Sequence, residues 1–205
     1  MEIAEPLVAK LAELLPECES ITVARPGFIN FKLKPSALTA VINEVIAAGD
    51  DYGKNDSGKG KHLLLEWVSA NPTGDLHCGH ARNAAWGDCI ARMMEASGWD
   101  VLREFYVNDA GNQIEKFAKS LEARYLQIIK GEDAVEFPED GYHGDDIKEL
   151  AKLFCEKYGD SWLELPTSER HKMMAEFGLS VNLPKMKRDL ARYGIEYDQW
   201  FLESS

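Results

Sequence analysis

Hydrophobic and polar positions in the first sixty residues predict a small α+β unit. Residues 3–15 place apolar side chains at the spacing of an amphipathic helix. Residues 21–23 and 28–33 have the pattern of short strands, and the second of them alternates between apolar and polar positions. A Pro-Ser-Ala start predicts a helix over residues 35–48. The polar, glycine-rich residues 49–61 that follow predict a linker.

The linker leads into a strand–helix–strand pattern. Residues 62–69 are predicted as a strand, residues 77–97 as a helix and residues 99–107 as a second strand, with Gly98 suited to the helix end. A connection of this length implies a parallel strand pair with a right-handed crossover. We therefore expect the start of a Rossmann-like sheet, which binds ligands at the C-terminal ends of its strands.

The remaining residues have a mainly helical pattern. Helices are expected over residues 112–130 and 145–158, from Thr167 onward, and over 183–193. Four large apolar side chains in the strand–helix–strand region are expected in the core rather than in a site: Trp86, Met93, Phe105 and Val107.

Composition and charge narrow the class of protein. An apolar content of 45% and a charged content of 28% are ordinary for a soluble globular protein. No apolar run approaches the ~20 residues that span a bilayer, and the first ten residues lack the features of a signal peptide. The net charge of −12 argues against nucleic-acid binding over the whole surface. We expect a cytoplasmic protein with no membrane partner.

The acidity is concentrated in one block. Residues 132–166 hold eleven acidic and three basic residues, whereas residues 167–205 are balanced. The basic side chains of this last segment form either a local basic face or an ordinary solvated helix surface: Arg170, Lys172, Lys185, Lys187, Arg188 and Arg192. The four cysteines form no C-x-x-C pair and are expected to be free thiols.

The densest candidate chemistry lies where the predicted strand gives way to the helix. His77, Gly79 and His80 open the helical run. The free N–H groups of a first helical turn attract phosphate oxygens, and imidazole N–H groups add further donors. Two structural alternatives stay open: the histidines cap the helix or lie in the core, or they bind zinc, although no third ligand is obvious nearby. Cys78, between them, is expected to be a small hydrophobic residue, with a reactive thiol as the alternative.

A longer pattern surrounds these residues, and it resembles arginyl-tRNA synthetase, a class I aminoacyl-tRNA synthetase. The class signature is H-x-G-H, and the arginyl family adds flanking segments to it. The matching segments here are Ser69-Ala70-Asn71-Pro72-Thr73-Gly74, Leu76-His77-Cys78-Gly79-His80, Gly87-Asp88 and Tyr106 to Gln113. Residues 25–31 also resemble the end of the family's N-terminal appended domain, which contacts the tRNA elbow.

The resemblance implies a fold and a domain organisation. The fold class is α/β: the first half of a Rossmann-like (HUP-type) parallel sheet with a helical insertion, preceded by part of a small α+β appended domain. Residues 1–54 would be a remnant of the appended domain and residues 55–61 a linker. Residues 62–205 would be the first part of the catalytic domain, divided into a nucleotide-binding β-α-β unit, a mainly helical insertion and a return to the sheet: residues 62–113, 114–194 and 195–205.

The resemblance also implies site residues. His77 and His80 would be catalytic phosphate donors, and ATP would further contact Gly79, Pro72, Thr73 and Gly74. Gly79 is expected to let the adenine approach the backbone. The arginine substrate would contact the side chains of Glu66, Ser69, Asn71, Asn108, Asp109 and Gln113.

Several of these residues have structural alternatives. A carboxylate is the natural partner of a guanidinium, and Glu66 is unexpected in an apolar strand, where a buried charge needs a partner. It could instead lie at an exposed strand edge or pair with Arg82 or Arg103. Asp109 could simply cap the next helix. His143 is expected in a surface loop.

The implied function is that of an arginine–tRNA ligase, which uses ATP with Mg²⁺ to join L-arginine to tRNA-Arg, and the parent enzyme is expected to be monomeric. No protein metal site is expected. The family's lysine-rich second signature has only a superficial echo here, Lys185-Met186-Lys187-Arg188. The chain is therefore expected to be a fragment that cannot complete catalysis alone. Two other hypotheses are a non-catalytic nucleotide- or tRNA-binding module of the same fold, and a related nucleotidyltransferase that adenylates a small acid without tRNA.

Overall fold

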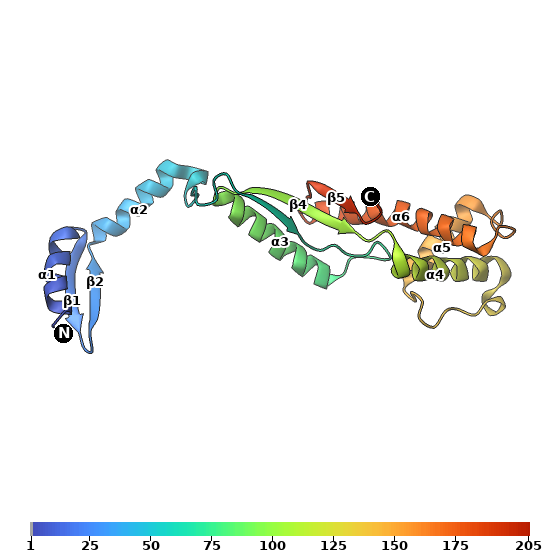
Figure 1. Ribbon diagram of the computed structural model, residues 1–205, viewed down its shortest axis with the longest axis horizontal. Helices are drawn as coiled ribbons and strands as arrows, with labels where there is room; N and C mark the ends of the chain where they lie inside the picture. Colours follow the sequence, from blue (N-terminus) through green and yellow to red (C-terminus); the bar gives the residue numbers. More distant parts are fainter. Residues whose placement is uncertain (1) are drawn as a thin grey trace. The chain divides into compact units, whose positions relative to one another are not determined.

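The computed structural model describes residues 2–205, which divide into two compact units between Lys54 and Asn55. In the first unit, α1 (Ala4–Leu14) packs on an antiparallel pair of strands, β1 (Cys18–Ala24) and β2 (Phe28–Leu33) (Figure 1). The strand predicted over residues 21–23 is longer in the structure, because pairing with β2 extends on both sides of these residues.

The first unit ends with α2 (Pro35–Ala48) and the short 3₁₀ helix η1 (Gly49–Asp51). Pro35 occupies the first turn of α2, where its missing N–H costs no hydrogen bond. No residue of α2 is buried. Its apolar side chains are exposed at helical spacing: Leu38, Val41, Ile42, Val45 and Ile46.

The second unit is built on a parallel three-stranded sheet in the order β3 (His62–Glu66), β4 (Asp100–Val107) and β5 (Gln199–Leu202). The expected parallel pair and the return of the chain to the sheet are confirmed. The strand predicted over residues 62–69 is too long, because β3 ends at Glu66 and the backbone then turns sharply.

One face of the sheet carries the main hydrophobic core. Helix α3 (Cys78–Ala96) lies along β3 and β4 (Figure 1). Phe105 and Val107 are buried beneath the helices, as predicted. On the other face Leu64, Leu102 and Phe201 remain 55%, 41% and 38% exposed.

The prediction that Trp86 and Met93 belong to the core is wrong. Their exposures are 67% and 69%. The buried side of α3 uses small residues instead, Ala84, Gly87 and Ala91. Small residues let the helix lie close to the sheet, and Trp86 and Met93 point outward, whereas Met94 packs against the edge of the sheet core.

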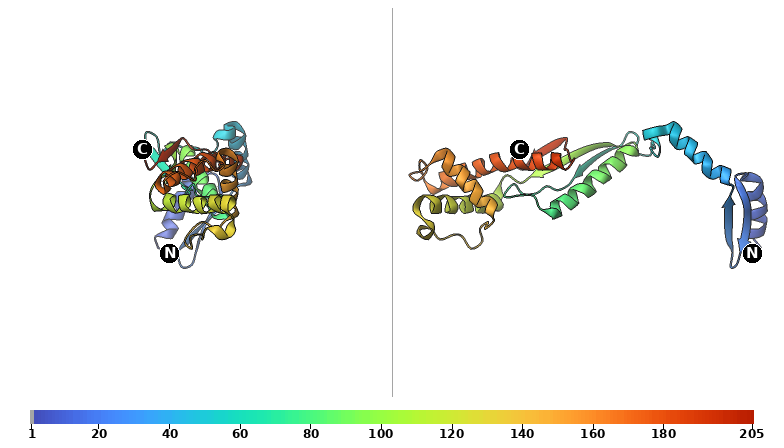
Figure 2. Two further views of the ribbon diagram at one scale, coloured as in Figure 1. Left: turned by 90° about the vertical axis from the view of Figure 1, so that its right-hand side faces the viewer. Right: turned by 180° about the vertical axis from the view of Figure 1, so that it is seen from behind.

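The segment between β4 and β5 is helical, and three helices form its core: α4 (Gly111–Lys130), α5 (Asp145–Tyr158) and α6 (Thr167–Arg192) (Figure 2). A short 3₁₀ helix, η2 (Glu132–Ala134), follows α4. Two separate helices were expected after Pro166, but α6 is continuous through Pro184. Met174 and Phe177 pack in the insertion core, whereas Met186 and Leu190 pack in the sheet core. Contacts at both ends hold the helix together despite the proline. Across residues 2–205, no helix is long and apolar enough to cross a membrane.

Candidate functional site

The chain leaves β3 through a strained turn. Val68 and Ser69 have φ angles of 67° and 40°, both in the left-handed region. Such a φ is rare for a β-branched residue and costs about 1–3 kcal/mol. Three hydrogen bonds hold the turn: Val68 N–H donates to Asn83 Oδ1 (2.6 Å), Ser69 N–H donates to Trp67 O (3.0 Å), and Tyr106 N–H donates to Ser69 Oγ (3.1 Å). The ends of β3 and β4 and helix α3 are thereby joined at one place.

The first turn of α3 is capped by two histidines. His77 is the N-cap residue, and its Nδ1 accepts a hydrogen bond from Gly79 N–H (3.1 Å). The Nδ1 atom of His80 in turn accepts one from His77 N–H (3.2 Å). The two rings stack with centroids 3.7 Å apart. The structural alternative of helix capping is therefore confirmed for these two side chains. Their role as phosphate donors stays a prediction, and it is compatible with the cap because each ring uses only one nitrogen there.

These caps determine where the imidazole protons lie. A neutral imidazole that accepts through Nδ1 carries its hydrogen on Nε2. Both rings can therefore donate through Nε2–H. Burial, and then the charge of His77, lower the pKa of His80 below its ordinary value of 6.5. Both effects favour the neutral form of His80, which is the form that its hydrogen bond in the cap requires. The helix start combines its own partial positive charge with two imidazole donors.

The local packing by itself favours glycine at position 79. A Cβ built on this residue would lie 2.9 Å from Cε1 and 3.0 Å from Nδ1 of the His77 ring. A side chain here would therefore disturb the capping ring. Whether adenine approaches the same backbone stays a prediction. Cys78, beside Gly79, is an exposed free thiol.

The segment that joins the turn to α3 is held by α6. Pro72 and Thr73 are buried, and Asn182 Nδ2 donates to Pro72 O (2.9 Å). Lys185 forms an ion pair with Asp75. Asn71, in the same segment, is exposed, and its side chain is accessible.

The residues of α6 that resemble the lysine-rich signature make structural contacts. Lys185 pairs with Asp75, and Met186 is buried in the sheet core. Lys187 lies over the ring of Trp200, 4.6 Å from its centroid. The structure thus gives each of these three residues a packing role.

Glu66 is exposed at the end of β3, which is an edge strand of the three-stranded sheet. The expectation of a buried charge there is wrong, because its side chain points to the uncovered face of the sheet. Among residues 2–205 it forms no ion pair. Arg103, one of its possible partners, instead binds both carboxylate oxygens of Glu95 at 2.6 and 2.8 Å. Glu104 is the register partner of Glu66 on β4.

The polar residues after β4 have partners at the end of β5. Asp109 accepts hydrogen bonds from Ser204 N–H (3.0 Å) and Ser204 Oγ–H (2.6 Å). The amide of Asn108 lies 2.9 Å from Glu203 Oε2, an acceptor that orients its nitrogen toward that side. The N-cap of α4 is Ala110, so Asp109 does not cap this helix and that alternative is wrong.

The outer face of this sheet edge is acidic. The pKa of Tyr106 is raised by burial and then by Glu203, with smaller effects from Asp109 and Glu66. Three carboxylates thus act on one phenol at the C-terminal ends of the strands. Such a surface attracts cations, including a guanidinium.

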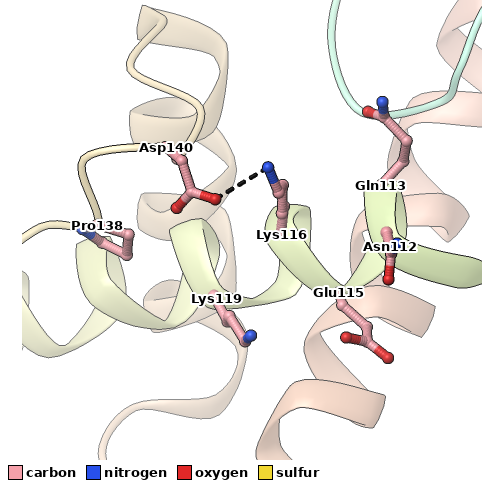
Figure 3. Close-up of a pocket in the computed structure, with 8 residues that line it drawn as sticks. Asn112, Gln113, Glu115, Lys116, Lys119, Pro138 and Asp140 are labelled. Carbon is pink, nitrogen blue, oxygen red and sulfur yellow. Dashed lines mark ion pairs between the residues drawn. The ribbon is translucent and has the colours of Figure 1, made fainter.

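Gln113 lies at a different hollow. A cavity of about 280 Å³ separates the start of α4 from the loop that follows η2 (Figure 3). Its lining includes Gln113, Lys116 and Asp140, and the last two form an ion pair of 2.9 Å. Gln113 Oε1 accepts a hydrogen bond from Tyr142 Oη–H (2.5 Å). This cavity was not expected from the sequence, because loop and helix come together only in the fold.

A second unexpected hollow lies beside the histidines. It occupies about 370 Å³ on the outward side of α3 and is lined by Gly79, Arg82, Asn83 and Trp86. The sequence shows that these residues share one helix face. It does not show that no other element covers this face.

The remaining predicted residues are in simpler environments. His143 is exposed in the loop before α5, as expected, and its ring packs on Phe137. Within residues 2–205, no three His, Cys, Asp or Glu side chains gather closely enough to hold a metal ion.

Comparisons with known proteins agree with this geometry. Residues 41–149 match the family model for the catalytic domain of class I tRNA synthetases (R), and residues 1–33 match the model for the arginyl tRNA synthetase N-terminal domain. The arginine–tRNA ligase of Acetivibrio thermocellus is 48% identical over 204 residues, which are 100% of this chain and 36% of that protein. The one from Caldanaerobacter subterraneus is 51% identical over 204 residues, with the same coverage.

Among solved structures, a Campylobacter jejuni protein assigned as an arginyl-tRNA synthetase matches with a TM-score of 0.71 and 35% identity. The match covers 84% of this chain and 37% of that one. The chain thus spans about a third of the length of these relatives.

Proposed function

Because this chain belongs to the arginyl class I tRNA synthetases, we propose that its parent protein is an arginine–tRNA ligase. The observation that carries the proposal is the first turn of α3, where two stacked imidazoles each keep Nε2–H free to donate. In the first step the arginine carboxylate attacks the α-phosphate of ATP and pyrophosphate leaves. In the second step the arginyl group passes to the terminal adenosine of tRNA-Arg.

The chain's residues act in this reaction mainly by positioning and by charge. His77 and His80 donate to phosphate oxygens as negative charge grows on them, and the N–H groups of α3 add to the same field. Gly79, between the two histidines in the sequence, is exposed and leaves the nucleotide room. Pro72, Thr73 and Gly74 shape the loop that carries this corner.

The arginine substrate is proposed to bind at the ends of β3 and β4. Ser69 and Asn71 contact its α-amino group, and Glu66 contacts its cationic part. Asn108 and Asp109 form a further wall. Gln113 lies at a separate hollow and is left out of this proposal. The exposure of Glu66 and the acidic surroundings of Tyr106 support this assignment.

Mg²⁺ is proposed to arrive with the nucleotide. Mg²⁺ usually keeps several waters and binds through substrate phosphates with one or two carboxylates, rather than in a cage of protein ligands. The side chains at this corner, two imidazoles that donate and few carboxylates, fit that mode. The ion neutralises charge on the phosphates.

The two units are proposed to have different roles. Residues 1–54 belong to the appended domain that contacts the tRNA elbow, and residues 55–61 link it to the catalytic part. Residues 62–205 are proposed as the first part of the catalytic domain. The parent is proposed to act in the cytoplasm as a monomer.

ATP–pyrophosphate exchange tests the proposal. The parent protein is assayed with each amino acid, with and without tRNA-Arg, and the 205-residue chain is assayed in parallel. We expect exchange with arginine only. Exchange with a different amino acid contradicts the arginine assignment, and exchange with none by the parent favours a binding module that has lost catalysis.

A further inference from the structure

The sharpest backbone feature at the proposed site is the left-handed turn at Val68 and Ser69. It separates β3 from Asn71, so its conformation determines where Ser69 and Asn71 lie relative to the histidines. Valine adopts this conformation rarely because its branched side chain crowds the backbone. The turn therefore needs to be held by contacts outside itself.

Asn83 supplies such a contact from α3. Its Oδ1 accepts the N–H of Val68 at 2.6 Å, across fifteen residues of sequence. Asn83 lies three residues after His80, so one helix turn carries both the phosphate donor and the group that holds the strand end. The bonds that orient the histidine rings involve only His77, Gly79 and His80.

We propose that Asn83 is a positioning residue that sets the Val68–Ser69 turn and, through it, the binding of the amino-acid substrate. This inference rests on the proposed function. The proposal predicts different effects on the two substrates. Loss of Asn83 frees the turn that carries Ser69 and Asn71, whereas the histidine caps stay intact. Binding of the amino acid then weakens, while binding of ATP is preserved.

Two variants of similar volume separate the hydrogen bond from packing. Asn83→Leu removes the acceptor, whereas Asn83→Asp keeps an oxygen at the same place. Cys89→Leu is the matched control, since Cys89 is an exposed residue of the same helix. In the parent protein we expect Asn83→Leu to raise KM for arginine at least tenfold and to change KM for ATP less than twofold. We expect Asn83→Asp to return KM for arginine to within threefold of the parent's value.

A second-site variant tests the turn itself. Glycine reaches a positive φ without strain, so Val68→Gly in the Asn83→Leu background is expected to recover part of the lost arginine affinity. Equal changes in both KM values, a fall in kcat alone, no effect of Asn83→Leu, or no difference between the Asp and Leu variants would each overturn the proposal.

Amide hydrogen exchange of the 205-residue chain keeps the test independent of activity. Asn83→Leu is expected to speed exchange of the Val68 amide, and Asn83→Asp to leave it slow. If the unsubstituted parent shows no arginine-dependent ATP–pyrophosphate exchange, the proposed function fails. The hydrogen exchange of the Val68 amide then decides by itself whether Asn83 holds the turn. An unchanged Val68 amide in Asn83→Leu overturns that role.

Discussion

His77 and His80 stack face to face at the start of α3, with ring planes 19° apart and Nδ1 of each ring occupied by a backbone N–H. Stacking and capping together hold the two rings beside each other, with one nitrogen of each ring used in the cap. Under the proposed function, the hydrogen bonds that satisfy the helix start would also orient two imidazole donors toward a triphosphate.

Removal of one donor should affect the chemical step. We expect His80→Ala in the parent protein to lower the rate of arginine-dependent ATP–pyrophosphate exchange about 100-fold, as for loss of one donor to a developing charge, and to leave arginine binding nearly unchanged. Cys78→Ala, in the variable position between the histidines, is the control. Activity of His80→Ala within a few-fold of the parent's would contradict the donor role.

The charge state of His80 can be measured directly. Burial and His77 lower the pKa of His80, so the midpoint of its protonation should lie below the ordinary histidine pKa of 6.5. Because the unfolded chain binds that proton at higher pH, this group destabilises the fold as pH falls below 6.5. An NMR titration of the His80 ring is expected to give a midpoint under 6.5. A midpoint above that value would show that the ring is charged in its cap.

Glu66 is expected to select the cationic substrate. Glu66→Gln keeps the shape of the side chain and removes its charge, so KM for arginine should rise about tenfold or more, as expected for loss of a charge-assisted hydrogen bond. Glu104→Gln, on the neighbouring strand, is the matched comparison. If both variants give the same small change, only the general negative potential of the sheet edge matters.

Gly87 is expected to be required for packing rather than chemistry. A Cβ at this position would lie 2.1 Å from Cγ of the Trp67 ring, which is buried in the sheet core. We expect Gly87→Ala to lower the free energy of unfolding by about 1–3 kcal/mol, the usual cost of overpacking. Urea unfolding measures this change, with Cys89→Ala on the exposed side of α3 as the control. A midpoint equal to the control's would mean that the ring moves aside without cost.

The helical insertion has its own internal anchor. Glu122 accepts from Arg170 Nε and pairs with His171 Nε2, each at 2.6 Å, and its side chain is only 12% exposed. Arg170 also donates to the carbonyl groups of Leu163 and Leu165, so it ties the loop before α6 to α4.

Loss of the Glu122 charge should therefore leave the largely buried guanidinium of Arg170 without its charged partner. We expect Glu122→Gln to cost about 1–3 kcal/mol in urea unfolding, below the range for a fully buried pair. Lys148→Ala, which removes an exposed pair with Asp145, should leave the unfolding midpoint unchanged. A Glu122→Gln midpoint as high as that of Lys148→Ala would show that the network adds nothing to stability.

Much of the architecture followed from the sequence alone. Periodicity and end signals predicted the α5 range as observed and the bounds of α3 and β4 to within one residue, because these segments have local patterns that agree with their final structure. The parallel pairing of β3 with β4 followed from the length of the connection. The family resemblance came from short segments whose residues are contiguous in the chain.

Only the tertiary structure decided the rest. The exposure of Trp86 and Met93 depends on a buried helix face made of alanine and glycine, which a pattern of large apolar residues does not reveal. The continuity of α6 through Pro184 depends on two cores that it joins. The strained turn at Val68, and the bond from Asn83 that holds it, arise from residues fifteen positions apart. Local sequence encodes local preference, whereas burial, strain and charge pairing depend on which distant residues meet.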